Sequence, residues 1–306
     1  MSDFAAHVDD YLRLRRGLGF KLEFPGHVLP QLVDYLDIGG EQTLTSQLAI
    51  AWAGLPRDVK PISLAHRLGA ARGFAKYLQT IDPATEIPPC GIWPSTAPRP
   101  VPYLWSATNI GLLLDAARHL DPPLRAATHE TLLGLLATTG LRVGEALGLD
   151  RDDVDLTDGV LTIGDAKFGR SRLVPLHPSV TDALHAYTAC RDRLDPTPTS
   201  TRFFVSHLGT PLTYGALHHT FVALTTAIGL RTPTSRPRVH DLRHSFAVQT
   251  LIDWHRSGVN IDGRMAVLSA YLGHVTPAGT YWYLSAAPEL MELVAARLDR
   301  RFGPSR

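Results

Sequence analysis

Apolar residues in the first part of the chain recur with the period of an α-helix. They form three stripes whose members lie mostly three or four positions apart, as expected when one face of each helix is buried. Glycines interrupt the first two stripes, and Pro61 precedes the third, where proline suits the first helical turn. The stripes are Phe4, Val8, Tyr11 and Leu12; Val28, Leu32, Val33 and Leu36; and Leu64, Leu68, Ala71, Ala75 and Leu78. We expect a small four-helix domain over residues 1–87.

The segment that follows is rich in proline. Proline fixes φ and lacks an N–H group, so such a run favours an extended connection over a helix or strand. The prolines are Pro88, Pro89, Pro94, Pro98, Pro100 and Pro102. We therefore predict a linker at residues 88–105 and a second domain over residues 106–306.

The second part of the chain mixes helical patterns with one β-rich region. Two β-rich runs, 160–164 and 172–176, flank a polar turn that contains glycine, which predicts a β-hairpin. The helices predicted before it are Ser106–His119, Ala126–Thr138 and a short one ending near Leu149, and helical patterns resume from about Ser179. The sequence therefore predicts a mainly α protein with a small β-hairpin or sheet.

Composition excludes several classes of protein. A length of 306 residues allows two domains, and 44% hydrophobic with 19% charged residues is ordinary for a globular chain. No apolar run reaches the roughly 18–20 residues of a membrane-spanning helix, and the acids near the N-terminus argue against a signal peptide. Cys90 and Cys190 form no disulfide framework and join no metal-like cluster. We expect a cytoplasmic protein without membrane association, metal or cofactor.

The overall charge gives little guidance, whereas one local segment stands out. The formal net charge is +1, which is not the strongly basic balance of many nucleic-acid binders. The segment Arg231–His244, however, holds four arginines and one acid. A focused basic patch can attract phosphate even on a nearly neutral protein. A solvated basic loop is the alternative, and charge alone favours it.

Cleavage of a phosphodiester without a metal requires a few kinds of side chain. Two arginines can clamp the non-bridging oxygens, because a planar guanidinium matches phosphate in a bidentate fashion. Histidine or lysine can move protons, and a hydroxyl can attack. Arg142 lies in Thr-Gly-Leu-Arg-Val-Gly-Glu, where the flanking glycines let the backbone approach a ligand. A surface arginine at a helix start is the simpler alternative for this residue.

His240 and Arg243 lie in His-Asp-Leu-Arg-His-Ser-Phe-Ala, on one face of a predicted helix. His244 stands four positions after His240, which is also the spacing of a zinc-binding helix. Asp241 occupies the position at which the zinc-protease motif has glutamate, and no cluster supplies an obvious third ligand besides His274. A polar helix start and a zinc hydrolase therefore remain alternatives to a phosphate site.

Lys167 and two tyrosines complete the set of candidates. Lys167 lies in the predicted hairpin turn and is the only lysine after the linker. An amine can give up its proton, which a guanidinium does not, so this lysine indicates proton transfer unless it stands there by chance. Tyr281 and Tyr283 lie in an aromatic cluster, which is more often part of a core than the site of a nucleophile, and the residues alone do not choose between the two tyrosines.

Taken in order, these motifs resemble the boxes of the tyrosine recombinase, or phage integrase, family. The motif around Arg142 is similar to the first arginine box, and Lys167 with the Arg-Leu-Val-Pro-Leu that follows is similar to the hairpin lysine. His240 and Arg243 resemble the His-x-x-Arg box, and Leu-Gly-His274 resembles the third-box histidine. Each box alone is weak, but five in the right order make coincidence improbable.

The same resemblance separates the two tyrosines. Tyr283 lies nine residues after His274 and three after Thr280, where the family places its nucleophile, and Tyr281 does not fit that register. The match covers most of the chain. It is weaker in residues 1–87, where the segment from Arg67 to Leu78 resembles the last helix of the core-binding domain.

The resemblance implies a fold and a reaction. The implied fold is a two-domain, C-shaped clamp made of a helical, SAM-like core-binding domain and a tyrosine recombinase catalytic domain. The implied reaction is site-specific cleavage and rejoining of double-stranded DNA through a 3′-phosphotyrosyl link, by a homo-tetramer on two DNA sites. The implied catalytic residues are Tyr283 as nucleophile, Arg142 and Arg243 on the phosphoryl oxygens, Lys167 as acid for the 5′-oxygen, His240 in proton transfer and His274 on the phosphate. The implied DNA contacts are Arg67, Arg72, Lys76, Arg170, Arg172 and Arg238.

Some features leave questions for the structure. The segment from Arg243 to His274 is about two helical turns longer than is usual in the family, which bears on how His274 and Tyr283 are presented. The tail Ala286–Arg301 has an apolar face that could dock on a neighbouring protomer or pack on its own core. A type IB topoisomerase-like strand relaxer and a non-catalytic DNA-binding protein are alternatives. The sequence does not separate a phage integrase from a transposon recombinase or a chromosome-dimer resolver.

Overall fold

The computed structural model describes residues 3–96, 101–165, 170–195, 199–274, 278–281 and 283, and for residues 165, 170, 262 and 278 the backbone alone. The chain divides into two compact units between Pro100 and Val101, inside the predicted linker. None of the described helices is long and apolar enough to cross a membrane.

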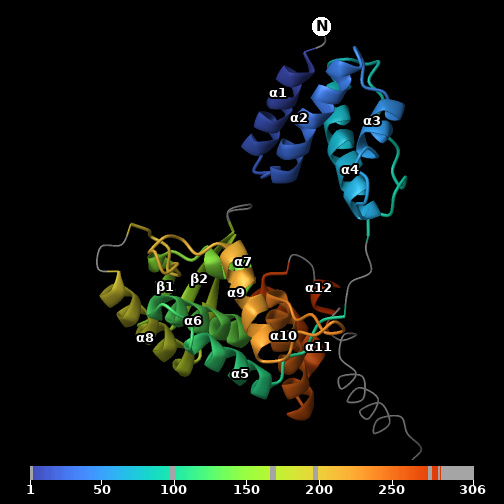
Figure 1. The fold of residues 1–306 in the computed structure, drawn as a ribbon. Coiled ribbons are helices and arrows are strands. Elements are labelled where there is room, and N and C mark those ends of the chain that lie inside the picture. Colours follow the sequence, from blue (N-terminus) through green and yellow to red (C-terminus); the bar gives the residue numbers. More distant parts are fainter. Residues whose placement is uncertain are drawn as a thin grey trace, which may run out of the picture. The chain divides into compact units, whose positions relative to one another are not determined.

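Within residues 3–96, the first unit packs four helices around one core (Figure 1). They are α1 (Phe4–Gly17), α2 (Glu23–Ile38), α3 (Ser46–Ala53) and α4 (Pro61–Leu78). Helix α4 contacts the other three, and Trp52 and Phe74 are among the largest side chains that are fully buried. Thr45 caps α3, because its hydroxyl accepts a hydrogen bond from the backbone N–H of Leu48 at 3.3 Å. Helices α1, α2 and α4 fall where the apolar stripes predicted them.

The second unit is also mainly helical (Figure 1). Its described helices are α5 (Ala107–Arg118), α6 (Pro123–Thr139), α7 (Val143–Leu147), α8 (Pro178–Leu194), α9 (Tyr214–Ala227), α10 (Val239–Arg256), α11 (Ile261–Leu272) and α12 (Ala278–Tyr281), with a 3₁₀ turn η1 (Arg151–Asp153). Helix α6 lies at the centre and packs against α5, α8 and α10. The buried leucines Leu132, Leu133, Leu135 and Leu136 explain this position, because they give α6 apolar contacts on several sides.

A small antiparallel sheet follows α7. It consists of β1 (Val154–Asp155), β2 (Val160–Asp165) and β3 (Arg170–Pro175), in the order β1-β2-β3. Strands β2 and β3 form the predicted hairpin, with Leu161 opposite Val174 and Ile163 opposite Arg172. These four side chains share the face of the sheet that joins the core, because side chains alternate along a strand. Strand β1 was not predicted, since two residues are too few to show an alternating pattern.

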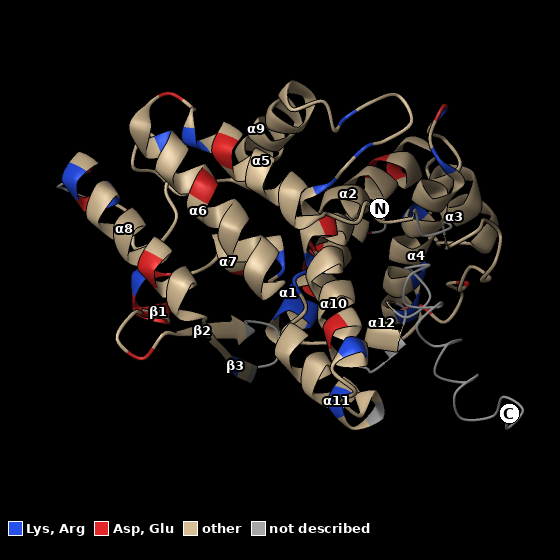
Figure 2. Cartoon of the chain, turned by 90° about the horizontal axis from the view of Figure 1, so that it is seen from below, with Lys and Arg blue, Asp and Glu red and all other residues tan. Residues whose placement is uncertain are grey.

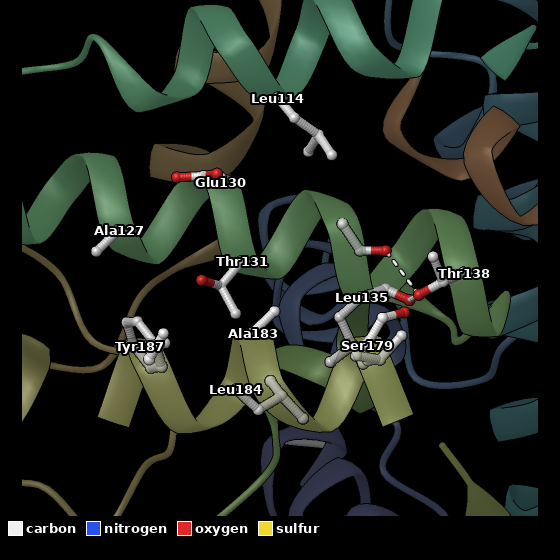
Figure 3. Close-up of a pocket in the computed structure, with 13 residues that line it drawn as sticks. Leu114, Ala127, Glu130, Thr131, Leu135, Thr138, Ser179, Ala183, Leu184 and Tyr187 are labelled. Carbon is white, nitrogen blue, oxygen red and sulfur yellow. Dashed lines mark hydrogen bonds between the residues drawn. The ribbon is translucent and has the colours of Figure 1, made fainter. Parts of the chain in front are cut away.

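Helices α5, α6 and α8 surround a cavity of ≈ 350 Å³ (Figure 3). Its lining is mainly apolar and includes Leu114, Leu135 and Leu184, with Glu130 at one side. The hydroxyl of Thr138 is turned to its own helix, donating to the carbonyl of Gly134 at 2.8 Å. None of the predicted catalytic residues that the structure describes lines this cavity, so their chemistry lies elsewhere in the unit.

Charges of both signs are spread over the second unit. Lys and Arg residues lie on α8, α10 and α11, and Asp and Glu residues lie among them on α8 and α10 (Figure 2). The predicted basic segment is less free than its sequence indicates. Arg231 donates to the carbonyl of Pro237 at 2.7 Å, Arg238 pairs with the buried Asp241 at 2.7 Å, and Arg243 is itself buried.

Candidate active site

Three arginines from distant parts of the chain meet at the C-terminal end of α11. Arg172 donates from Nε to the carbonyl of Tyr271 at 2.9 Å, across 99 residues of sequence. Arg243 donates from Nη2 to the carbonyl of Leu272 at 2.8 Å, and Arg142 donates from Nη2 to the carbonyl of Gly273 at 2.7 Å. The last carbonyls of a helix lack partners within it and carry partial negative charge, which suits guanidinium groups. The structure thus brings Arg142 and Arg243 to adjacent backbone oxygens.

Arg243 lies deepest in this cluster and is 2% exposed. Its Nη1 donates to the carbonyl of Gly140 at 2.7 Å, and its Nη2 lies 2.9 Å from Nε2 of His274. Burial lowers the pKa of Arg243, and a hydrogen bond with Tyr283 opposes that shift. Gly140 adopts φ +62°, and a Cβ there would lie 2.5 Å from the ring of Phe246, so glycine is needed at this close approach. The Thr-Gly-Leu-Arg motif therefore serves Arg243 as well as Arg142.

The contacts of His274 define its protonation state. Arginine can only donate, so Nε2 of His274 accepts from Arg243, and Nδ1 carries the hydrogen that is donated to Oγ1 of Thr280 at 2.7 Å. Burial, together with the positive charges of Arg243 and Arg142, lowers the pKa of His274 to about 4. His274 is therefore a neutral imidazole at pH 7, held between Arg243 and Thr280.

Tyr283 lies against this histidine, whereas Tyr281 does not. Tyr283 is 3% exposed, and its ring stacks on that of His274 with centroids 5.9 Å apart and planes 24° apart. It also packs edge-on against His244 at 5.4 Å and belongs to a small apolar cluster of α10 and α11. Tyr281 is 50% exposed. The geometry therefore favours Tyr283 as the phenol beside the arginines.

His240 and His244 extend the site along α10. Their rings meet edge to face with centroids 4.6 Å apart. His240 is exposed, yet desolvation and the charge of Arg243 lower its pKa, and burial lowers the pKa of His244 to about 4. Over the described residues, no three His, Cys, Asp or Glu side chains come together as a metal-binding group.

Glu145 joins two of the arginines and was not singled out from the sequence. Its carboxylate accepts from Nη1 of Arg142 at 2.8 Å and from Nη1 and Nη2 of Arg172 at 3.1 and 2.8 Å. It also accepts from the backbone N–H of Arg142 at 2.9 Å, which closes the first turn of α7. Burial alone would raise the pKa of Glu145, but the hydrogen bonds from Arg172 and Arg142 lower it. The signal was the glutamate three residues after Arg142, just past a predicted helix start.

A comparison with known families decides what this cluster belongs to. The model of the Phage integrase family matches residues 106–289, which is more than half of the chain. The chain belongs to the phage integrase family. Its members are also called tyrosine recombinases, so the resemblance inferred from the motif order is confirmed.

Relatives in the phage integrase family extend the likeness over the whole chain. A Sinorhizobium fredii protein named as integrase/recombinase y4rB is 43% identical and covers 99% of each chain. The tyrosine recombinase XerC of Azotobacter vinelandii is 31% identical over 62% of this chain and 60% of its own. XerD of Vibrio vulnificus is 27% identical over 86% of this chain and 80% of its own.

Solved integrase-family structures share the fold. The integrase of transposon Tn1549, in complex with circular intermediate DNA, aligns with a TM-score of 0.66 at 16% identity, over 95% of this chain and 98% of that one. XerH bound to palindromic difH substrate aligns with a TM-score of 0.58 at 17% identity, over 95% and 94%. The mainly α fold with a small sheet, predicted from the sequence, is therefore confirmed as the fold of a tyrosine recombinase catalytic domain.

The segment between Arg243 and His274 consists mainly of two packed helices. Helix α10 begins at Val239, α11 ends at Leu272, and the two helices pack against each other. Ser257–Asn260 form the turn between them. This pair brings His274 back to Arg243, since Nε2 of His274 lies 2.9 Å from Nη2 of Arg243.

The remaining predicted residues are either outside the described part of the chain or have contacts that do not test their predicted roles. Lys167 and the tail Ala286–Arg301 lie outside the described residues, and of Arg170 only the backbone is described. In the first unit, Arg67 donates to Oε1 of Gln31 at 3.0 Å and lies over the ring of Trp52, and Arg72 donates to the carbonyls of Pro88 and Pro89. Lys76 is exposed. The contacts of Arg67, Arg72, Lys76, Arg172 and Arg238 with DNA remain predictions.

Proposed function

We propose that this site-specific recombinase cleaves and rejoins DNA strands with Tyr283 as its nucleophile. Membership of the integrase family supports the reaction, and the structures of recombinases on DNA support a duplex as the partner. One observation supports the choice of residues more than any other. Arg142 and Arg243 are fastened to the adjacent carbonyls of Gly273 and Leu272, and Arg243 hydrogen-bonds the phenol of Tyr283.

In the proposed step, the phenolic oxygen of Tyr283 attacks the scissile phosphorus and forms a 3′-phosphotyrosyl ester. The bond from phosphorus to the 5′-oxygen breaks, and Lys167 gives that oxygen a proton. Arg142 and Arg243 stabilise the negative charge that develops on the non-bridging oxygens. A 5′-hydroxyl of a second strand then attacks the ester and restores the phenol. The phosphotyrosyl ester stores the energy of the cleaved phosphodiester bond, so rejoining requires no external energy source.

The two histidines have different parts. His240 is exposed, and it is neutral at pH 7 because its pKa is lowered. We propose that it accepts the proton of Tyr283. Both ring nitrogens of His274 are engaged, by Arg243 and Thr280. We propose that His274 first orients Arg243. The predicted bond to phosphate requires a hydrogen on Nε2, because phosphate oxygens only accept, so we propose that the imidazole takes up a proton when phosphate takes the place of Arg243.

The assembly and setting are part of the same proposal. Four protomers would act on two DNA sites, as strand exchange between two duplexes requires, with the first unit as an additional DNA-binding domain. The reaction would take place in the cytoplasm, on chromosomal, phage or transposon DNA. A topoisomerase-like relaxer would instead act as a monomer on one duplex, so a two-site recombination assay separates the alternatives.

Trapping of the covalent adduct tests the nucleophile. The full chain is incubated with a pool of nicked duplexes of randomised sequence, in which cleavage releases a short fragment and leaves the protein on the DNA. Adducts that survive denaturant are sequenced for the DNA site and digested for mass spectrometry of the linked peptide. We expect the phosphate on Tyr283.

Two matched variants complete that experiment. Tyr283→Phe removes the nucleophilic oxygen and keeps the ring contacts with His274 and His244, so adducts should fall by about 10³-fold or more. Tyr281→Phe changes an exposed ring two residues away and should leave adduct formation unchanged. A Tyr283→Phe protein that still forms adducts, or a Tyr281→Phe protein that forms none, overturns the assignment.

A further inference from the structure

Arg172 occupies an unusual place on strand β3. It shares the inward face of the sheet with the buried Val174, and its side chain is 20% exposed, whereas Leu173 between them faces outward at 66%. An arginine pointing inward next to an outward leucine reverses the usual arrangement of a half-buried strand. Such a reversal indicates that the guanidinium has a partner inside the protein.

Partners inside the protein accept a hydrogen bond from each of the three nitrogens of the Arg172 guanidinium. Two parallel N–H groups bind the two oxygens of Glu145 at 3.1 and 2.8 Å, and Nε binds the carbonyl of Tyr271 at 2.9 Å. Gly273 makes this arrangement possible, since a Cβ there would lie 2.6 Å from Nη1 of Arg172. The glycine of the Leu-Gly-His motif, with φ +67°, thus serves both as the cap of α11 and as the place where Arg172 passes.

Glu145 connects Arg172 to Arg142. The same carboxylate binds the side chain and the backbone N–H of Arg142, at 2.8 and 2.9 Å. One carboxylate between two guanidinium groups leaves a net charge of +1 on the three side chains. Without Arg172 the remaining pair would be neutral, and the carboxylate would be free to draw Arg142 away from the position that a phosphate would occupy. Because Arg142 is 42% exposed, little else fixes its guanidinium apart from the carbonyl of Gly273.

We propose that Arg172 is a positioning residue for strand cleavage and does not contact DNA. Through Glu145 and the end of α11 it holds Arg142 in place, and it keeps the net charge of the three side chains positive. This inference rests on the proposed catalytic role of Arg142. It replaces the expectation that Arg172 binds the DNA backbone, since each of its three guanidinium nitrogens already donates to a group inside the protein. The negative charge on the phosphoryl group grows toward the transition state, so the loss of Arg172 should affect the cleavage rate more than the affinity for DNA.

The test measures cleavage and binding separately in the full chain. The substrate is a nicked duplex with the sequence that the wild-type protein cleaves most often in the randomised pool. Single-turnover cleavage is measured at saturating protein, and the Kd is measured in the Tyr283→Phe background. We expect Arg172→Gln to slow saturated cleavage by about 10- to 100-fold while the Kd changes by less than about 3-fold. A Kd weakened about 10-fold with saturated cleavage unchanged identifies a DNA contact and overturns the proposal.

A double-mutant cycle shows whether Arg172 acts through the carboxylate. In a Glu145→Gln background the partner charge is gone, so adding Arg172→Gln should slow cleavage by less than about 3-fold further. If Arg172→Gln slows cleavage by the same factor in the Glu145→Gln background as in the wild type, the proposal is contradicted. The matched control is Arg118→Gln, which removes an exposed ion pair with Glu130 in the same unit and should change neither quantity.

Two further arms keep the outcome interpretable. If Arg172→Gln does not fold, judged by circular dichroism and thermal melting, Arg172→Lys takes its place. Lysine keeps the charge but cannot hold both oxygens of Glu145 and the carbonyl of Tyr271 together, so it must also slow saturated cleavage. Arg142→Gln is measured alongside. If it cleaves like the wild type, the proposed catalytic role fails; if it is impaired while Arg172→Gln and Arg172→Lys are not, only the present inference fails.

Discussion

Both units of the molecule use arginine inside the structure, but in different ways. In the first unit, Arg67 lies over Trp52 with its guanidinium carbon 4.1 Å from the ring centroid, and Arg72 binds carbonyls 16 and 17 residues further along. The partners of both arginines lie within the helical domain itself. In the second unit, Arg142 and Arg172 reach 131 and 99 residues along the chain to the end of one helix.

The difference shows what identifies a site. A buried or half-buried arginine by itself indicates only that the residue has partners. In the second unit the arginines converge on adjacent carbonyls, one of them keeps an exposed edge, and a neutral histidine and a buried phenol lie next to them. It is this convergence that matches the chemistry of phosphoryl transfer, and the first unit has no counterpart among its described residues.

Loss of Arg243 should give the largest effect and tests the convergence directly. Arg243→Gln removes the proposed phosphate ligand and leaves the carbonyls of Gly140 and Leu272 without their buried donor. We expect saturated single-turnover cleavage to fall by about 10³-fold, and the second unit to lose roughly 2–4 kcal/mol of stability in urea denaturation. Near-normal cleavage by Arg243→Gln would show that the buried arginine braces the fold as Arg67 does, and the contrast between the units would disappear.

The acid side of the pH–stability curve should give an effect of intermediate size. His244 and His274 have pKa values of about 4 in the folded protein, against about 6.5 in an unfolded chain. Between these values the unfolded state binds more protons, so stability is complete above about pH 6.5 and falls as the pH falls toward 4. We expect a loss of roughly 1–2 kcal/mol between pH 7 and pH 5, after allowance for partial exposure.

Urea denaturation at a series of pH values measures that slope. The matched protein is the double variant His244→Gln, His274→Gln. It removes both groups and should reduce the slope in this range, while His129 and His240, whose pKa values burial also lowers, keep part of it. His244 and His274 both lie in the second unit, so a fragment-resolved probe such as hydrogen exchange should place the loss there. An unchanged slope in the double variant would mean that other groups cause the acid sensitivity.

The smallest effect is expected in the first unit. Arg67→Ala removes the guanidinium that covers Trp52 and should cost about 1 kcal/mol of stability, with saturated cleavage unchanged. Tryptophan fluorescence during urea denaturation measures the loss. If stability is unchanged while DNA binding weakens and the slope of log Kd against log salt falls by about 1, Arg67 is the predicted backbone contact and not an internal brace.

Much of this arrangement followed from local pattern. The apolar stripes predicted α1, α2 and α4, because apolar residues three or four positions apart, bounded by glycine or proline, are typical of amphipathic helices. The hairpin followed from two β-rich runs around a polar turn. Arg142, Arg243, His274 and Tyr283 followed from motif order, and the structure brings them together.

The rest could not be read from local pattern, because it depends on contacts between distant residues. Nothing near Arg172 in sequence shows that its partners are Glu145 and the carbonyl of Tyr271. Alternation along the strand places its side chain on the same face as Val174 but does not name a partner. Thr280 was noted only as a spacing marker, yet its hydroxyl accepts the hydrogen on Nδ1 of His274. Strand β1 is set by its pairing with β2 and not by its own two residues.

The α10–α11 pair also has a consequence for how such enzymes can vary. Both functional ends of the pair, the start of α10 and the end of α11, lie at the arginines, and its turn at Ser257–Asn260 lies at the opposite end, about 20 Å along α10 from Arg243. Insertions at that turn change the length of the arms without shifting the chemistry. The turn is therefore a place where evolution can add recognition or regulatory elements, and where an engineer can attach a reporter.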